Sequence, residues 1–262
     1  MTRETVALQP AYVLHQRAFR DTSRIVDCLT PEHGRVALVA RGVQRPRSPL
    51  RAVLMPFAPL TLSWVRRGEL GTLTAAESVG APLSIAADAI MSGWYINELI
   101  LRLVQSHDVQ TEIFALYART LNELCATVEP AMVLRPFEKS LLDLLGYGLA
   151  LTTEEDGSTP VEPGQRYRYR TGRGPQRTGA GDGGPLVVSG EVLLNMAADR
   201  FDDPATVSAS RSILSAALNE QLGGRELRVR DVARDMQRVR QDPAQSLSQG
   251  PRDSQNQDGS GA

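Results

Sequence analysis

The chain has 262 residues, of which 42% are apolar, and its formal net charge is -1 at pH 7. A chain of this length and composition can bury a packed core and form one large domain or two ordinary ones. It contains no run of eighteen apolar residues, and residues 1–14 lack the basic and apolar regions of a signal peptide. We therefore expect a cytoplasmic protein without a membrane span.

Positive charge is concentrated in the N-terminal third of the chain. Residues 1–80 contain eleven arginines, no lysine and six acidic residues, a formal charge of +5, so that the residues from Ala81 onward carry -6. Such segregation predicts a surface that binds a polyanion. The alternative is a solvated surface that simply uses arginine, because Lys139 is the only lysine in the chain.

The first eighty residues have the pattern of a small β-barrel. Five short alternating segments, separated mostly by turn residues, are expected as strands at 6–15, 23–30, 35–41, 59–65 and 72–79. No helical period long enough for a crossover interrupts them, so residues 1–80 predict an antiparallel five-stranded barrel of the oligonucleotide-binding type, the OB fold. Alternation places Trp64 on the apolar face, in the core. Spacing does not decide whether Tyr12 and Phe19 are core residues or stack on bases.

The densest group of candidate binding residues surrounds the third predicted strand. Arg35 and Arg41 share one face of this strand, and the loop after it contains prolines that prevent pairing or helix formation. Exposed arginines of this kind replace counterions along a phosphate backbone. The predicted DNA-binding residues are Arg35, Arg41, Arg45, Arg47 and Arg51, followed by Arg17, Arg20, Arg24, Arg66 and Arg67.

The pattern becomes helical after Pro82 and predicts an α-helical domain over residues 81–240, which makes the fold class α+β. Helices are expected at 83–107, 112–127, 131–145, 190–198, 206–222 and 227–240. In the first of them Trp94 belongs to a buried apolar stripe. Residues 151–185 form a predicted loop or short hairpin with a second arginine cluster at 166–177, and residues 241–262 a polar, disordered tail. Whether the arginines at 166–177 and 228–240 contact DNA is open.

The sequence contains no pattern of a catalytic or metal site. His15, His33 and His107 are scattered over different predicted elements, and no nucleophile or phosphate-loop motif is present. Cys28 and Cys125 lack the close spacing of metal ligands and are expected to be buried thiols. We therefore expect a binding protein, with no catalytic residue, cofactor or metal.

Several motifs together resemble the RecO family of bacterial recombination and repair proteins. The first is the run over residues 11–42, which opens with A-Y-V-L-H-Q-R-A-F-R at 11–20. The others are Y-I-N-E-L at 95–99, F-E-K-S-L-L-D-L-L-G-Y-G-L at 137–149 and L-G-G-R-E-L-R-V-R at 222–230. The resemblance, which covers about residues 11–240, implies a nucleoid-associated protein that binds single- and double-stranded DNA and anneals complementary strands. It also implies loading of RecA, with RecR as partner, onto DNA coated by single-stranded-DNA-binding protein. Some members carry a four-cysteine zinc module where this chain, at 151–185, has no cysteine, so zinc is not expected.

Action on coated strands implies a contact with the acidic, apolar-ended C-terminal tail of the coating protein. Arg135 and Lys139, one helical turn apart beside leucines, are the predicted contacts. The alternative is an ordinary core helix with solvated cations. For the whole protein, the alternatives are an OB-fold adaptor between proteins and an RNA-binding protein. The oligomeric state, the stoichiometry with RecR and the preference for single or double strands are open.

Overall fold

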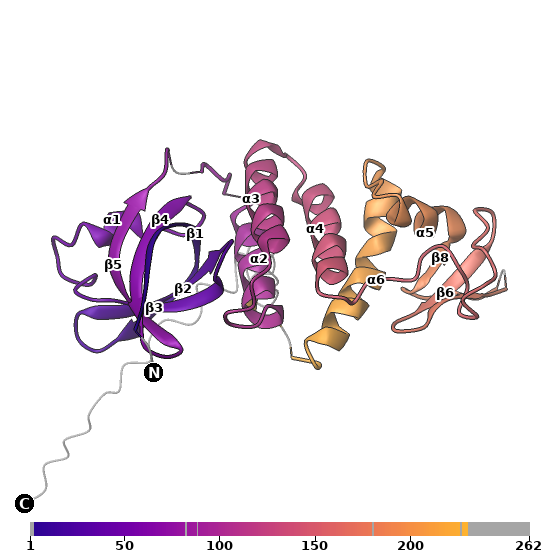
Figure 1. The fold of residues 1–262 in the computed structure, drawn as a ribbon. Helices are drawn as coiled ribbons and strands as arrows, with labels where there is room; N and C mark the ends of the chain where they lie inside the picture. Colours follow the sequence, from indigo (N-terminus) through magenta and orange to yellow (C-terminus); the bar gives the residue numbers. More distant parts are fainter. Residues whose placement is uncertain (1–2, 82, 88, 180, 226, 230–262) are drawn as a thin grey trace, which may run out of the picture. The chain divides into compact units, whose positions relative to one another are not determined.

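Five strands in the N-terminal part of the chain close into a barrel (Figure 1). In this computed structural model the described residues are 3–81, 83–87, 89–179, 181–225 and 227–229. The strands are β1 (Glu4–Phe19), β2 (Ser23–Thr30), β3 (Gly34–Ala40), β4 (Leu60–Arg66) and β5 (Leu70–Ser78), in the order β1-β2-β3-β5-β4 around the ring. Helices and a small sheet follow, which confirms the predicted α+β class with an N-terminal barrel of OB type.

β1 is long enough to pair with both of its neighbours. Its first half pairs with β4, from Glu4 opposite Arg66 to Ala11 opposite Leu60, and its second half pairs with β2. β3 and β5 run parallel to each other, whereas the other neighbouring strands are antiparallel. The prediction of a wholly antiparallel barrel was wrong at this one seam, because an odd number of strands in a closed ring cannot alternate in direction at every neighbour.

Apolar side chains from alternate strand positions fill the barrel. Trp64 is 1% exposed and lies among other buried barrel residues, so it is a core residue, as its place in the alternating pattern predicted. Tyr12 is also buried, and its ring centroid lies 5.5 Å from that of Phe114 and 5.2 Å from that of Tyr117. Tyr12 therefore packs between the barrel and the helices.

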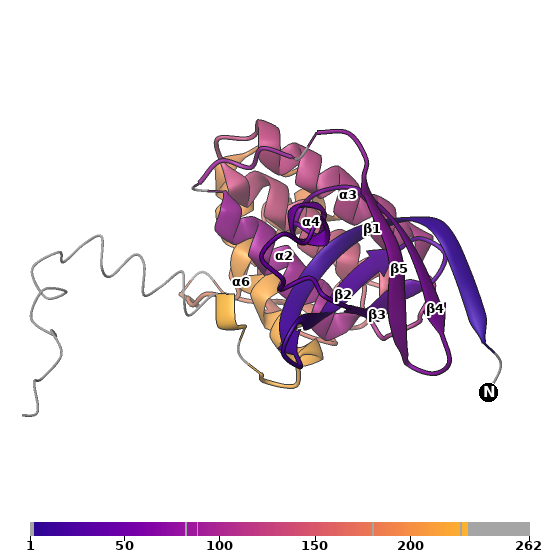
Figure 2. The same cartoon turned by 90° about the vertical axis from the view of Figure 1, so that its left-hand side faces the viewer.

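The segment between β3 and β4 packs against the barrel core, to which its Val43, Leu54 and Ala58 belong. It contains one short helix, α1 (Leu50–Val53), which begins after Pro49. Proline suits the start of a helix because its missing N–H would have no partner there. Figure 2, a view turned by 90°, shows the barrel strands in front of the helices.

The larger helices lie close to their predicted positions. They are α2 (Ile90–Leu103), α3 (Thr111–Ala126), α4 (Pro130–Leu144), α5 (Gly190–Ala197) and α6 (Pro204–Gln221). α2 is shorter than predicted at both ends. α6 begins at a local signal, because the Asp203 carboxylate accepts hydrogen bonds from the N–H groups of Ala205 and Thr206. The elements pack in a series. α2 and α3 contact the barrel, α3 contacts α4, α4 contacts α6, and α6 contacts α5.

A hydrogen-bond relay joins α2 and α3 to β1. Asn97, which is 1% exposed, donates from Nδ2 to the carbonyl of Leu14 over 2.8 Å. The Tyr117 hydroxyl donates to Asn97 Oδ1 over 2.6 Å. The pairing of β1 with β2 shifts register between Val13 and His15 and skips Leu14. Asn97 thus supplies a donor to a carbonyl at an irregular point of the strand.

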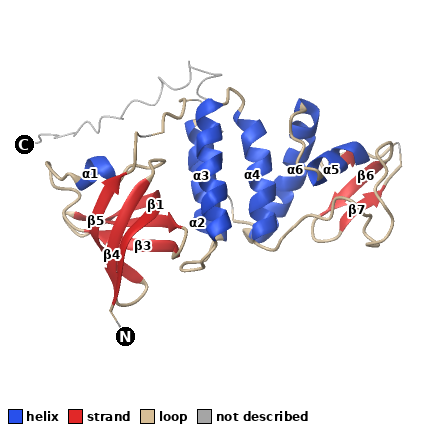
Figure 3. Ribbon diagram, turned by 45° about the horizontal axis from the view of Figure 1, so that its top comes forward, coloured by secondary structure: helices blue, strands red, loops and turns tan. Residues whose placement is uncertain are grey.

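The predicted loop or hairpin at 151–185 contributes two strands to a three-stranded sheet. β7 (Gly174–Arg177) and β8 (Val187–Ser189) flank β6 (Arg166–Arg170), and Figure 3 shows these strands beyond the helices. The sheet is more regular than predicted because Tyr167 and Tyr169 are both buried and give β6 an apolar face.

Part of the region predicted to follow α6 lies outside the described residues. Of the expected helix at 227–240 only 227–229 are described, and the expected tail at 241–262 lies wholly outside them. Residues 3–225 contribute to one compact unit, so the division into domains at 80 and 240 stays a prediction. Among the described helices, none combines the length and apolar character needed to cross a membrane.

Candidate nucleic-acid interface

Three of the predicted arginines line a hollow beside the β1–β2 turn, which we call the turn hollow. Its volume is about 550 Å³, and its walls come from this turn, the residues that follow β3 and the start of β5. Arg20, Arg41 and Arg45 line it. Phe19 lines it as well, and the Arg20 guanidinium lies 5.2 Å from the centroid of the Phe19 ring. The turn hollow therefore has a cationic lining with one aromatic ring.

Two more predicted arginines line a second hollow on the other side of the same loop, which we call the Trp94 hollow. Its volume is also about 550 Å³, and it is formed by β1, β2, residues 43–56 and α2. Arg24 and Arg51 supply its cations, and Met55 and Trp94 supply apolar surface. Gln16 accepts a hydrogen bond from Arg24 Nη1 over 3.3 Å.

The loop between the two hollows is tied to the start of β2. The backbone N–H of Gln44 donates to the Thr22 carbonyl over 3.0 Å, and its side-chain amide donates to the Ser23 carbonyl over 2.9 Å. Gly42 has a φ of +69°, a conformation that glycine adopts without strain, and its carbonyl accepts from the Arg45 N–H. These contacts fix the backbone of the loop, which carries Arg41 and Arg45 at the turn hollow and Arg51 at the Trp94 hollow.

Most of the predicted arginines are free to meet a polyanion. Within the described part of the chain, no carboxylate forms an ion pair with eight exposed arginines. These are Arg17, Arg20, Arg24, Arg41, Arg45, Arg47, Arg51 and Arg67. Five of the eight line the two hollows; Arg17 and Arg47 lie on neighbouring segments, and Arg67 lies in the β4–β5 turn.

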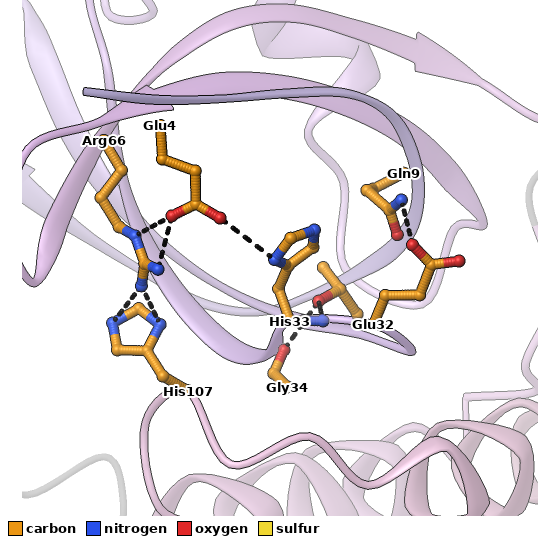
Figure 4. Close-up of polar contacts among 8 residues, drawn as sticks. Glu4, Gln9, Glu32, His33, Gly34, Arg66 and His107 are labelled. Atoms are coloured by element: carbon orange, nitrogen blue, oxygen red, sulfur yellow. Dashed lines mark hydrogen bonds and ion pairs between the residues drawn. The ribbon is translucent and has the colours of Figure 1, made fainter. Parts of the chain in front are cut away.

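Arg35 and Arg66 have internal partners at the other end of the barrel. Arg35 donates from Nε to the carbonyl of Val104 over 3.1 Å. Arg66 binds the Glu4 carboxylate with two hydrogen bonds of 3.0 and 2.6 Å, and its Nη1 lies 2.6 Å from Nδ1 of His107 (Figure 4). Arg35 does share a strand face with Arg41, but six residues of strand separate them by about 20 Å. We therefore leave Arg35 and Arg66 out of the candidate interface.

The cluster around Arg66 shifts the pKa values of its neighbours. The hydrogen bonds from Arg66 hold the pKa of Glu4 below its usual value. Burial, followed by the positive charge of Arg66, lowers the pKa of His107. His33 lies 3.8 Å from the other oxygen of Glu4 (Figure 4). A neutral His107 can accept the hydrogen bond of Arg66, because a guanidinium has only donors.

Arg135 and Lys139, predicted to bind an acidic tail, are held by carboxylates within the helical region. Arg135 Nη1 lies 2.7 Å from Oε2 of the fully buried Glu138. Lys139 Nζ lies 2.8 Å from Asp199 and 3.1 Å from Asp143. Burial acts to lower the pKa of Lys139, but its hydrogen bonds to Asp199 and Asp143 outweigh burial and raise it. Arg135 and Lys139 are 7% and 8% exposed, so an acidic tail would have to displace these carboxylates to bind either side chain.

The second arginine cluster is partly compensated. Arg177 binds Glu154 over 3.0 Å and Glu162 over 2.7 Å, and Arg170 lies 3.9 Å from Glu155. Its arginines therefore form a weaker candidate surface than the two hollows. Whether they contact DNA stays open.

The described residues contain no group of three or more His, Cys, Asp and Glu side chains arranged to hold a metal ion. Cys28 is fully buried, and this burial raises the pKa of its thiol. Cys125 is half-buried.

Sequence reasoning missed two residues of the interface. Trp94 was placed in a buried stripe of α2, yet it lines a hollow that only the approach of residues 43–56 creates. Gln44 ties the loop to β2, and no local pattern marks it. Trp94 is half-buried, because Phe57 covers part of its ring.

The chain matches two family models in succession. The model described as Recombination protein O N terminal matches residues 3–82, and the model described as Recombination protein O C terminal matches residues 86–231. Together they span the barrel and the helical region.

Full-length relatives agree with these models. The chain is 41% identical to the DNA repair protein RecO of Nitrosococcus oceani over 234 residues, which are 89% of this chain and 95% of the relative. It is 40% identical to that of Aromatoleum aromaticum over 237 residues, 90% and 99% of the two chains, and 42% identical to that of Ralstonia nicotianae over 235 residues, 89% and 86%. Both models match in order, the first of them over the closed five-stranded barrel. The chain therefore belongs to the RecO family of DNA repair and recombination proteins.

Proposed function

We propose that this protein is a non-catalytic recombination mediator that binds DNA through the two hollows and anneals complementary strands. The observation that carries the proposal is the set of five exposed arginines, without ion-pair partners among the described residues, on both sides of the loop after β3. They are Arg20, Arg24, Arg41, Arg45 and Arg51. Arg17, Arg47 and Arg67 extend this surface.

The proposed mechanism is electrostatic. Each guanidinium near a phosphate releases condensed counterions, which favours binding to DNA of any sequence and makes affinity fall with salt. Two strands that approach the same cationic surface repel each other less, since their phosphates are partly neutralised. Base pairing then supplies the free energy of annealing, and no nucleotide hydrolysis is needed.

Family membership supports the wider role. We propose that the protein acts in the cytoplasm on nucleoid DNA, binds RecR, and helps RecA to assemble on strands coated by single-stranded-DNA-binding protein. Arg135 and Lys139 could take part in its hold on the acidic tail of the coating protein only if the tail displaced their present carboxylate partners.

Fluorescence polarisation of labelled oligonucleotides tests the DNA-binding proposal. Arg41→Glu with Arg45→Glu should weaken binding to any sequence and flatten the slope of log affinity against log salt by about two, one for each lost phosphate contact. Arg211→Glu, an exposed arginine of α6, is the matched control and should leave both unchanged. Equal binding by the double variant and the control would contradict the proposal.

The same assay separates the other candidate roles. Tighter binding of RNA than of DNA of equal length would favour an RNA-binding protein. Absence of binding to either, with retained binding of RecR, would favour an adaptor between proteins.

A further inference from the structure

The Trp94 hollow differs from the turn hollow in the surface that it offers. Met55 is 50% exposed and lies in the lining with Leu54 and Trp94, so one side of the hollow is apolar. Arg24 and Arg51 lie in the same lining. The hollow thus combines the exposed Met55 and the half-buried Trp94 with two cations, a pairing that a purely electrostatic DNA-binding surface does not require.

The position of Trp94 is supported from within the fold. Its ring centroid lies 5.0 Å from that of Phe57, with the ring planes inclined at 67°, and Phe57 is 5% exposed. Gln16 donates to the carbonyl of Leu54, which ties β1 to the segment opposite Trp94. An aromatic residue held by a buried neighbour loses little freedom when a ligand covers it, so this arrangement is suited to binding.

Charge and size indicate what the hollow accepts. Its described lining contains no carboxylate, although His15 in the lining lies 3.7 Å from Asp27 outside it, so Arg24 and Arg51 supply the positive charge. The ligand should therefore be anionic with a flat apolar part. A volume of about 550 Å³ lies within the range of small-molecule sites. A nucleotide with an unpaired base has both features, because every base offers a π face and every linkage carries a phosphate.

We propose that the Trp94 hollow binds an unpaired base of a DNA strand, stacked on the indole of Trp94, with the neighbouring phosphates on Arg24 and Arg51. This inference rests on the proposed DNA binding and adds to it a preference for single strands. The faces of a base within a duplex are covered by its neighbours, so duplex DNA can use the arginines but not Trp94. Strands would then be held with some bases unstacked before they pair.

Intrinsic fluorescence reports on this hollow directly. The chain has two tryptophans, and Trp64 is 1% exposed within the barrel. A change in emission when DNA is added therefore comes mainly from Trp94. A single strand of fifteen thymidine nucleotides should quench the emission of Trp94. A duplex of the same length should quench it much less when the same fraction of the protein is bound, and fluorescence polarisation measures that fraction.

An abasic strand of equal length isolates the base contribution, since it keeps the phosphates. The native protein should bind the thymidine strand about tenfold more tightly than the abasic strand, as expected for one stacked base. Trp94→Leu should remove this difference, whereas Trp94→Phe, which keeps an aromatic ring, should retain most of it. Arg41→Glu with Arg45→Glu, in the turn hollow, should weaken both strands by the same factor. Circular dichroism would identify any variant that fails to fold.

The outcomes separate this inference from the proposed function. If no DNA binds in the polarisation assay, DNA binding itself is refuted. If the thymidine strand binds without quenching, or if Trp94→Leu and Trp94→Phe leave the tenfold difference intact, DNA binding stands and the base-binding role of Trp94 is overturned. It is overturned equally if an acidic peptide with apolar C-terminal residues quenches Trp94 and thymidine strands do not, since the hollow is then a peptide site.

Discussion

Replacing Asn97 by leucine tests how strongly the buried relay holds the barrel to the helices. The substitution removes two hydrogen bonds, one to the Leu14 carbonyl and one from the Tyr117 hydroxyl. Each is worth about 1 kcal/mol, and each buried group left without a partner costs about 1–3 kcal/mol. Because Asn97 is 1% exposed, water does not replace the lost partners without rearrangement. The cost of each unpaired group includes its lost hydrogen bond, so we expect a loss of about 2–6 kcal/mol in the free energy of unfolding.

Urea unfolding followed by circular dichroism measures this loss. Asn122→Ala is the matched control, because Asn122 is exposed and bonds only to a carbonyl of its own helix. It should change the free energy of unfolding by less than about 0.5 kcal/mol. Tyr117→Phe combined with Asn97→Leu should be less destabilising than the sum of the two single changes, since the double variant leaves no unpaired hydroxyl. A loss for Asn97→Leu as small as that of the control would refute the reasoning.

Two further predictions concern the end of the barrel that meets the α2–α3 loop. Gly34→Ala should cost more than about 2 kcal/mol, because φ is +60° and a Cβ would lie 2.0 Å from the Asp108 carbonyl oxygen. Gly157→Ala, with φ +74° and no atom within 4 Å, should cost only about 1 kcal/mol, and equal melting temperatures of the two variants would contradict the clash. His107 has a lowered pKa, so the unfolded chain takes up its proton first as the pH falls. The free energy of unfolding should therefore decrease as the pH falls through about 6.5. His107→Asn should make this decrease between pH 7.5 and 5.5 smaller. If the denaturation midpoint of this variant had the same pH profile as that of the native protein, the proposed role of His107 would be contradicted.

The barrel was predictable because its signal is local. Alternation along each strand reflects one buried and one exposed face, and Trp64 was placed correctly from its neighbours in the sequence alone. The helices were predictable for the same reason. At α6 the start is also marked locally, by Asp203 as the N-cap residue and Pro204 as the first helical residue. The hairpin of β6 and β7 agrees with the short hairpin predicted within 151–185, but the addition of β8 was not predictable, because this strand has three residues and lies beyond that range.

By itself the sequence determined the fold class, the family resemblance and the excess of arginine in the first eighty residues. Only the tertiary structure decided which cations are available. Arg35 and Arg66 meet acceptors near the α2–α3 loop, and Arg135 and Lys139 meet carboxylates of the helical region. The Trp94 hollow likewise exists only where β1, the loop after β3 and α2 come together. Local pattern fixes which face of an element is buried, but the charge or surface that remains free depends on neighbours distant in sequence.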